Sequence, residues 1–66
     1  MPSTVISSFH YDDIRKILVV TYLSGAVYEY MQVPREVYER MQSAFSKGTF
    51  LNKYIKRHYR YRKISE

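Results

Sequence analysis

The run from Ile14 to Leu23 sets the fold that this chain can adopt, because it is rich in β-branched and apolar residues and is followed directly by Ser24-Gly25. Such a composition predicts a β-strand. Alternate residues of a strand lie on opposite faces: Leu18, Val20 and Tyr22 on one, and Ile17, Val19 and Thr21 on the other. Apolar residues on both faces favour a central strand, or a strand covered by helices on one side. Ser24-Gly25 fits a two-residue hairpin turn, because glycine accepts a positive φ.

A strand is expected on each side of this central one. Residues 4–11 alternate with Val5, Phe9 and Tyr11 on one face, although Ser7 interrupts this face and Ile6 blurs the pattern. Asp12-Asp13 marks a turn after them, because short carboxylates accept hydrogen bonds from nearby backbone amides. Residues 26–32 form the third expected strand, with Tyr28 and Tyr30 on one face. Three such strands in sequence predict an antiparallel meander.

A first helix is expected after the meander. Pro34 favours a helix start, because the amide that it lacks would be unpaired in the first turn of a helix. Val37, Met41 and Ala44 then lie on one stripe, as in an amphipathic helix. Gly48 fits a cap at the C-terminal end of this helix.

A second helix is expected from Thr49, as its N-cap, to about Tyr59. The stripe that docks on the sheet comprises Leu51, Tyr54 and Ile55. Residues 60–64 alternate, and either extend as a short strand or lie along the surface. The sequence therefore predicts an α+β fold: a three-stranded antiparallel β-meander followed by a helical hairpin packed on one face (β-β-β-α-α).

The length of 66 residues allows a single domain, spanning residues 1–66, and favours a function at the surface. A domain this short buries only about 60% of its unfolded surface, so we expect no deep cavity and no small-molecule substrate. The chain has no cysteine and no long apolar run, which predicts a cytoplasmic protein without membrane insertion. No glycine-rich phosphate loop or catalytic constellation stands out, so we expect neither an enzyme nor a cofactor or metal.

The formal net charge of +5 is distributed unevenly along the chain. Residues 1–45 carry four cations and five anions, a net charge of −1. Residues 46–66 carry seven cations and only Glu66 as an anion, a net charge of +6. This asymmetry predicts an anionic partner for the last third of the chain.

Cations and tyrosines are interleaved in this last third. Four cations at positions i, i+3, i+4 and i+7 share one face of the expected helix: Lys53, Lys56, Arg57 and Arg60. The same region adds two cations and two tyrosines: Arg62, Lys63, Tyr59 and Tyr61. This combination predicts a nucleic-acid-binding surface, because cations hold phosphates and aromatic rings stack on bases. A solvated basic face, and docking on an acidic protein or a membrane surface, are the alternatives.

Tyr28 and Tyr30 are a second candidate, because two tyrosines on one sheet face are typical of the stacking platforms of sheet-based RNA binders. The same face is equally suited to carry the helices. In that case both rings belong to the core or its rim, with their hydroxyl groups reaching the edge. We favour this core interpretation and keep stacking as the alternative.

The chain also carries short motifs, in order, over nearly its whole length: Ser8-Phe9-His10-Tyr11-Asp12, Leu18-Val19-Val20-Thr21-Tyr22, Gly25, Tyr28-Glu29-Tyr30, Val33-Pro34, Val37-Tyr38, Ala44-Phe45-Ser46-Lys47-Gly48, Asn52, Ile55 and Tyr59. This set resembles the KTSC domain, a small module named for the C-terminus of some lysyl-tRNA synthetases. The resemblance implies a shared fold and, through the synthetase context, RNA binding. It implies no established activity.

Two functions follow as hypotheses. The first is a non-catalytic RNA-binding module that grips tRNA-like or single-stranded RNA through phosphates. Low sequence specificity is expected, because asparagine and glutamine, which read base edges, are nearly absent from the basic third. The second is a protein-interaction module, in which the strand edge at residues 4–11 adds a partner strand or the basic helix docks on an acidic partner.

Overall fold

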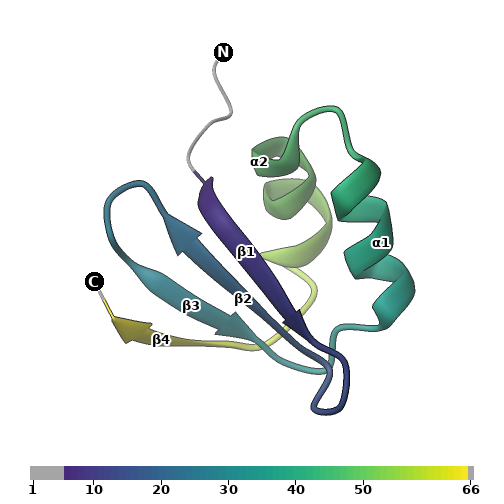
Figure 1. The fold of residues 1–66 in the computed structure, drawn as a ribbon, viewed down its shortest axis with the longest axis horizontal. Coiled ribbons are helices and arrows are strands. Elements are labelled where there is room, and N and C mark those ends of the chain that lie inside the picture. Colours follow the sequence, from purple (N-terminus) through teal and green to yellow (C-terminus); the bar gives the residue numbers. More distant parts are fainter. Residues whose placement is uncertain (1–5, 66) are drawn as a thin grey trace.

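A computed structural model, which describes residues 6–65, contains one antiparallel sheet with helical segments over one of its faces (Figure 1). The strands, β1 (Ile6–Asp12), β2 (Ile17–Tyr22), β3 (Val27–Tyr30) and β4 (Tyr61–Ser65), lie in the order β1-β2-β3-β4. The helical segments are α1 (Arg35–Ser43), α2 (Lys47–Phe50) and the π-helix η1 (Leu51–Ile55), which continues α2 directly. The predicted α+β fold is confirmed, and the tail adds a fourth strand to the meander.

Strand register gives the sheet two faces of different character. On the inner face, toward the helices, Leu18 pairs with Tyr30, and both side chains are buried. On the outer face His10 lies opposite Val19, and Val19 lies opposite Glu29; none of these three is buried. The two faces predicted for the central strand are therefore confirmed. Residues 4 and 5 of the first predicted strand lie outside the described part of the chain.

The core lies between the inner face and the helical segments. Its buried residues come from the sheet, the connection after β3 and all three helical segments: Tyr11, Leu18, Val20, Tyr30, Val33, Met41, Phe50, Leu51 and Ile55. The predicted stripe of the first helix is confirmed, since Met41 is buried and Val37 and Ala44 pack against the core. The prediction that Tyr54 docks on the sheet is wrong: the residue is 45% exposed, and its ring lies against Phe50.

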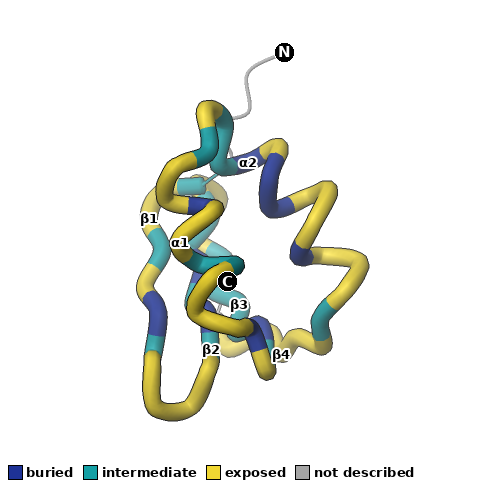
Figure 2. Tube along the Cα trace, turned by 90° about the vertical axis from the view of Figure 1, so that its right-hand side faces the viewer, coloured by how far each residue is buried: buried dark blue, intermediate teal, exposed yellow. Residues whose placement is uncertain are grey.

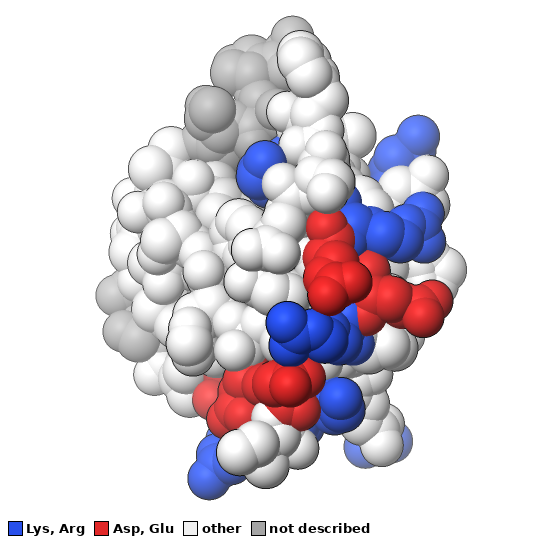
Figure 3. All heavy atoms as spheres, turned by 45° about the vertical axis from the view of Figure 1, so that its right-hand side comes forward, with Lys and Arg blue, Asp and Glu red and all other residues white. Residues whose placement is uncertain are grey.

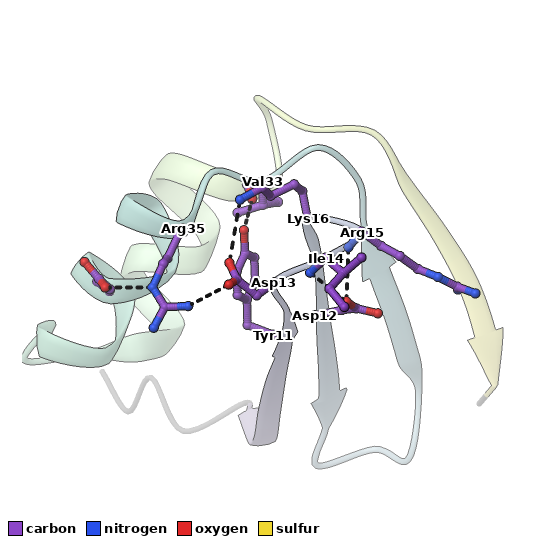
Figure 4. A network of polar contacts seen from close by, with 9 residues as sticks. Tyr11, Asp12, Asp13, Ile14, Arg15, Lys16, Val33 and Arg35 are labelled. Atoms are coloured by element: carbon purple, nitrogen blue, oxygen red, sulfur yellow. Dashed lines mark hydrogen bonds and ion pairs between the residues drawn. The ribbon is translucent and has the colours of Figure 1, made fainter.

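The β1–β2 turn begins at Asp12, as predicted (Figure 4). The Asp12 carboxylate accepts hydrogen bonds from the backbone amides of Ile14 and Arg15, at 3.0 and 3.1 Å. Because these bonds hold the chain in a turn, Ile14 is 92% exposed and β2 starts at Ile17, later than predicted. Lys16 leaves the turn with a positive φ of 59°.

The β2–β3 turn is longer than the predicted two residues. The amide of Tyr22 donates to the carbonyl of Ala26 at 2.8 Å, so three residues, from Leu23 to Gly25, lie between this pair. Gly25 has a φ of 98°, and its amide donates to the Tyr22 carbonyl at 2.9 Å. A glycine at the last position of a three-residue loop is a common hairpin geometry.

The second helical region differs from its prediction at both ends. Its N-cap is Ser46, not Thr49: the Ser46 hydroxyl accepts a hydrogen bond from the Thr49 amide at 3.2 Å. Gly48 lies inside α2, where its lack of a side chain allows it to be buried. The region ends at Ile55 rather than about Tyr59, because the chain widens into the π-helix η1 and then turns toward β4.

Candidate nucleic-acid interface

A groove of about 770 Å³ lies on the inner face, between the end of η1 and the strands β2, β3 and β4. Four tyrosines line the strand side: Tyr22, Tyr28, Tyr30 and Tyr61. Three polar residues from η1 and its C-terminal end line the other side: Asn52, Lys56 and Arg57. This volume is within the range of about 300–1,000 Å³ typical of ligand pockets. A groove of this volume differs from the prediction, made from the short chain, that the domain has no deep cavity.

The four tyrosines form one connected cluster of rings, which we call the tyrosine cluster. The Tyr28 ring lies at the middle of it, with its centre 5.3 Å from that of Tyr22, 6.3 Å from that of Tyr30 and 5.4 Å from that of Tyr61. The Tyr30 and Tyr61 rings are 5.9 Å apart. These distances are those of favourable aromatic pairs, which stabilise each other beyond the area that they bury.

The rings of the tyrosine cluster differ in exposure from one side to the other. Tyr30 is 1% exposed and belongs to the core, whereas Tyr61 on the edge strand β4 is 59% exposed. Tyr28 is half-buried between them. The core interpretation is thus confirmed for Tyr30. Tyr28 and Tyr61 retain ring surface that a base can contact, so stacking on Tyr28 stays a prediction.

Two hydroxyl groups of the tyrosine cluster are joined by a hydrogen bond. The Tyr22 and Tyr30 oxygens are 2.8 Å apart, and either can be the donor. Burial, above all, raises the pKa of Tyr30 far above its ordinary value, and burial also raises the pKa of Tyr22. Both phenols are therefore neutral at physiological pH, and each carries a proton that it can donate.

Two of the predicted cations line this groove, and a third lies over one of its tyrosines. Lys56 and Arg57 line it directly, and both are exposed at the C-terminal end of η1. Neither makes an ion pair with any residue in the range 6–65. On the opposite side, the Lys63 ammonium lies 6.0 Å from the centre of the Tyr28 ring. The groove therefore has an aromatic floor with positive charge on two sides.

The other predicted cations do not line this groove, because they do not share one helical face. Lys53 is on η1, whereas Arg60 lies in the connection beyond it, so the predicted i to i+7 arrangement is wrong for this pair. Arg62 pairs with Glu29 in the sheet, on the outer face, and its guanidinium donates to the Glu29 carboxylate at 3.0 Å. Figure 2 shows the largely exposed course of the chain after α2.

A second, shallower hollow of about 490 Å³ continues from the groove. Its lining comprises Arg57, His58, Tyr59, Arg60 and Tyr61. Arg57 and Tyr61 line both depressions, so the two adjoin. Tyr59, a predicted binding residue, is half-buried and packs against the core, which leaves only part of its ring accessible.

The charges on the other side of the molecule are arranged differently. Acidic and basic side chains adjoin one another on the face that Figure 3 shows. Arg35 on α1 makes ion pairs with Asp13 at 3.3 Å and with Glu39 at 3.1 Å, and Lys16 lies 3.6 Å from Asp13. These anions lie close enough to Arg35 to raise its pKa, with Glu39 as the larger cause. Positive charge there is neutralised locally, unlike the charge at the groove.

Sequence reasoning missed two contributors to the groove. The alternation of the second strand places Tyr22 on a strand face only, and no predicted binding site includes Asn52. For Tyr22 a signal was present, because its alternation with Val20 places it beside Tyr28 once the hairpin closes. Asn52 had no such signal, because its position depends on the π-helix.

Within residues 6–65, no three histidine, aspartate or glutamate residues are grouped to hold a metal, and no helix is long and apolar enough to cross a membrane.

The fold and the groove define a class of protein: a small α+β domain with an exposed tyrosine-lined groove flanked by cations. Comparison with known proteins identifies the family. The model of the KTSC domain matches residues 2–59, and the chain belongs to the KTSC domain family. The crystal structure of a KTSC domain protein from Yersinia pestis superimposes with a TM-score of 0.89 at 33% identity, covering 97% of this chain and 90% of that one.

Relatives by sequence are of two kinds. An uncharacterized protein of Stutzerimonas stutzeri is 40% identical over 65 residues, which is 97% of this chain and 92% of the relative. A lysine–tRNA ligase of Nostoc punctiforme is 39% identical over 62 residues, which is 94% of this chain but 11% of the ligase. The chain thus corresponds to a small segment of the ligases that it matches.

Proposed function

We propose that this KTSC domain is a non-catalytic module that binds single-stranded RNA in the groove, with phosphates on its cations and bases against its tyrosines. An RNA partner implies a cytoplasmic site of action. The proposal depends on one observation: Lys56 and Arg57 line the same groove as the tyrosine cluster. Single-stranded nucleic acid is recognised by this pairing of aromatic rings with a positively charged track.

Charge supports an anionic ligand. Lys56 and Arg57 are adjacent in sequence and repel each other, and no carboxylate of the described residues forms an ion pair with either of them. A phosphate backbone neutralises such cations and releases its own counterions, which makes binding favourable and dependent on salt. Arg62 contributes less to this surface, because Glu29 neutralises it on the outer face.

The related segment of the Nostoc punctiforme ligase supports RNA as the nucleic acid. That protein is a lysine–tRNA ligase, so its name states that it acts on a tRNA. The KTSC segment is a small part of it, and the whole ligase's activity does not extend to this chain. The support is limited to the class of partner.

The direct test is a titration of fluorescently labelled single-stranded RNA with the nuclease-treated protein at several salt concentrations. We expect a log–log salt slope of about −2 to −3, corresponding to roughly three to four phosphate contacts. Arg57→Glu should weaken binding by about tenfold and flatten the slope by roughly one unit.

Arg15→Glu is the matched control. Arg15 is exposed in the β1–β2 turn and does not line the groove, and both substitutions change the net charge from +5 to +3. An equal loss of affinity in the two variants would show that overall charge, and not the groove, attracts the RNA. Absence of binding by the wild-type protein at low salt would overturn the proposal.

A protein-interaction module is the second candidate, and the position of β1 favours it. Among the residues that the structure describes, β1 lies at the edge of the sheet and pairs only with β2, which leaves the other side of its backbone for a partner strand. Phe45, between α1 and α2, is also fully exposed. This candidate predicts a partner that remains bound after nuclease treatment and in the Arg57→Glu variant.

A further inference from the structure

Asn52 is the only asparagine of the chain, and it lies on the wall of the groove. Its neighbours in η1, Leu51 and Ile55, are buried in the core, so the backbone that carries Asn52 is firmly held. The Asn52 amide is exposed and makes no hydrogen bond to any described residue. It therefore presents one free donor group and one free acceptor to a ligand in the groove.

The Tyr22–Tyr30 hydroxyl pair adds a second polar group to the same groove. Two neutral hydroxyl groups have two protons, and the bond between them uses only one. The remaining proton has no acceptor among the residues that the structure describes. One further donor is thus available on the floor of the groove, across from Asn52.

Tyr61 supplies the surface on which a flat ligand can stack. Its ring is inclined by 50° to that of Tyr28 and by 45° to that of Tyr30, so neither ring covers its face by parallel stacking. The side chain is 59% exposed. A planar ring lying on Tyr61 would have the cations Lys56 and Arg57 near it, at the end of η1.

We infer that the groove holds one unpaired adenine base of the RNA, stacked on Tyr61 and recognised at its edge by the Asn52 amide and the tyrosine hydroxyl pair. This inference rests on the proposed function. The adjacent N7 acceptor and N6 donor of adenine match the one donor and one acceptor of asparagine, whereas the corresponding edge of guanine presents two acceptors. Lys56 and Arg57, which have only donors, hold the phosphates beside this base. The expectation of low sequence specificity is revised accordingly.

The test uses four labelled five-nucleotide RNAs that are identical uridine strands except for A, G, C or U at the central position. Wild-type protein should bind the adenine strand about tenfold more tightly than the all-uridine strand, in line with one good bidentate base contact. Asn52→Ala should remove this preference, so that the adenine strand and the all-uridine strand bind this variant with affinities within about twofold of each other.

Gln42→Ala is the control, because it removes an exposed amide on α1 that donates a hydrogen bond to the Tyr38 hydroxyl and does not line the groove. Circular dichroism checks that both variants fold. Equal affinity of wild-type protein for all four strands, a preference for guanine, or an adenine preference that survives in Asn52→Ala would each overturn the inference while leaving RNA binding intact. Absence of binding to all four strands would overturn the proposed function, and this inference with it.

Discussion

The inner face of the sheet has two halves that share one alternation pattern but have different surroundings. In the β1–β2 half, Leu18 and Val20 are completely buried beneath residues of the helical segments, such as Met41 and Leu51. In the β3–β4 half, Tyr30 is buried, but Tyr28 is half-buried and Tyr61 is largely exposed. The difference shows that alternation marks which residues share a face, whereas the length and direction of the helices decide how much of that face is covered.

Side-chain chemistry follows this division. Aliphatic residues such as Leu18 and Val20 gain free energy only when they leave water. Tyrosine tolerates a boundary, because its ring packs against neighbours while its hydroxyl group stays hydrated or hydrogen-bonded. Tyr28 and Tyr61 therefore keep the partly covered β3–β4 half stable without closing it. We assign stability mainly to the β1–β2 half, together with Tyr30, and binding to the groove over the β3–β4 half, which Tyr22 of β2 also lines.

The largest effect that separates the halves is expected for Leu18→Ala. Removal of a completely buried leucine side chain should lower the free energy of unfolding by about 3 kcal/mol, through lost burial and a residual cavity. In a domain of this size that is a large part of the total stability. Urea unfolding followed by circular dichroism measures it. A loss below about 1 kcal/mol would show that the β1–β2 half is not the main source of stability.

Tyr61→Ala is expected to change RNA affinity strongly and stability only slightly. Loss of one stacking surface should weaken single-stranded RNA binding by about tenfold. The free energy of unfolding should fall by only about 1 kcal/mol, through the lost ring contacts with Tyr28 and Tyr30. Fluorescence anisotropy and urea unfolding give the two values. Tyr54→Ala is the control, because Tyr54 is a comparably exposed tyrosine outside the groove. Equal effects of the two variants on RNA affinity would contradict the division into halves.

The boundary between the halves can be probed with Tyr30→Phe, which removes one partner of the hydroxyl pair and should lower the free energy of unfolding by about 1 kcal/mol.

Burial raises the pKa of Tyr30 in the folded protein, while in the unfolded chain it is about 10. The protonated phenol's stabilising contribution is thus fully present below pH about 10, and is lost as pH rises above that value, because only the unfolded chain releases the proton readily. Urea unfolding from pH 8 to 11 should show a smaller decline for Tyr30→Phe than for wild type. Parallel declines would argue against a buried, neutral Tyr30.

A smaller effect distinguishes the two faces of β4. Lys63 lies on the inner face above Tyr28, and its neighbour Arg62 lies on the outer face beside Glu29. Lys63→Ala should lower RNA affinity by roughly threefold, the effect of about one phosphate contact at moderate salt, whereas Arg62→Ala should change it by less. Anisotropy titrations at one salt concentration compare them. A larger loss for Arg62→Ala would place the RNA on the outer face.

The strands were largely predictable, because their signals are local. Alternation in β2, the short carboxylate of Asp12 and the glycine of the second turn each act over a few residues. The start of β2 and the length of the β2–β3 turn differ from the predictions, because specific hydrogen bonds set them and residue propensities do not. The hydrogen bonds of Asp12 delayed the start of β2, and the carbonyl of Ala26 lengthened the β2–β3 turn to three residues.

The groove was predictable only in part. The aromatic and cationic content of the last third was visible in the sequence, and so was the pairing of Tyr28 with Tyr30. The arrangement of the cations was not, because the i to i+7 spacing assumes an α-helix through Arg60. The hydrogen bond from the Lys56 amide to the Leu51 carbonyl, at 2.8 Å, creates a π-helical turn instead. That turn brings Lys56 and Arg57 to the groove together with Asn52, while Lys53 does not line it.

The most direct test of the division between a stabilising half and a binding half is an NMR titration of ¹⁵N-labelled protein with a short single-stranded RNA. We expect the shifted amides to cluster around the groove, at Tyr28, Asn52, Arg57 and Tyr61. The amide chemical shifts of His10 and Val19, whose side chains lie on the outer face, should not change, and neither should those of α1. Shifts centred on the outer face, on α1 or on the edge strand β1 would contradict the account and move the binding surface away from the tyrosine cluster.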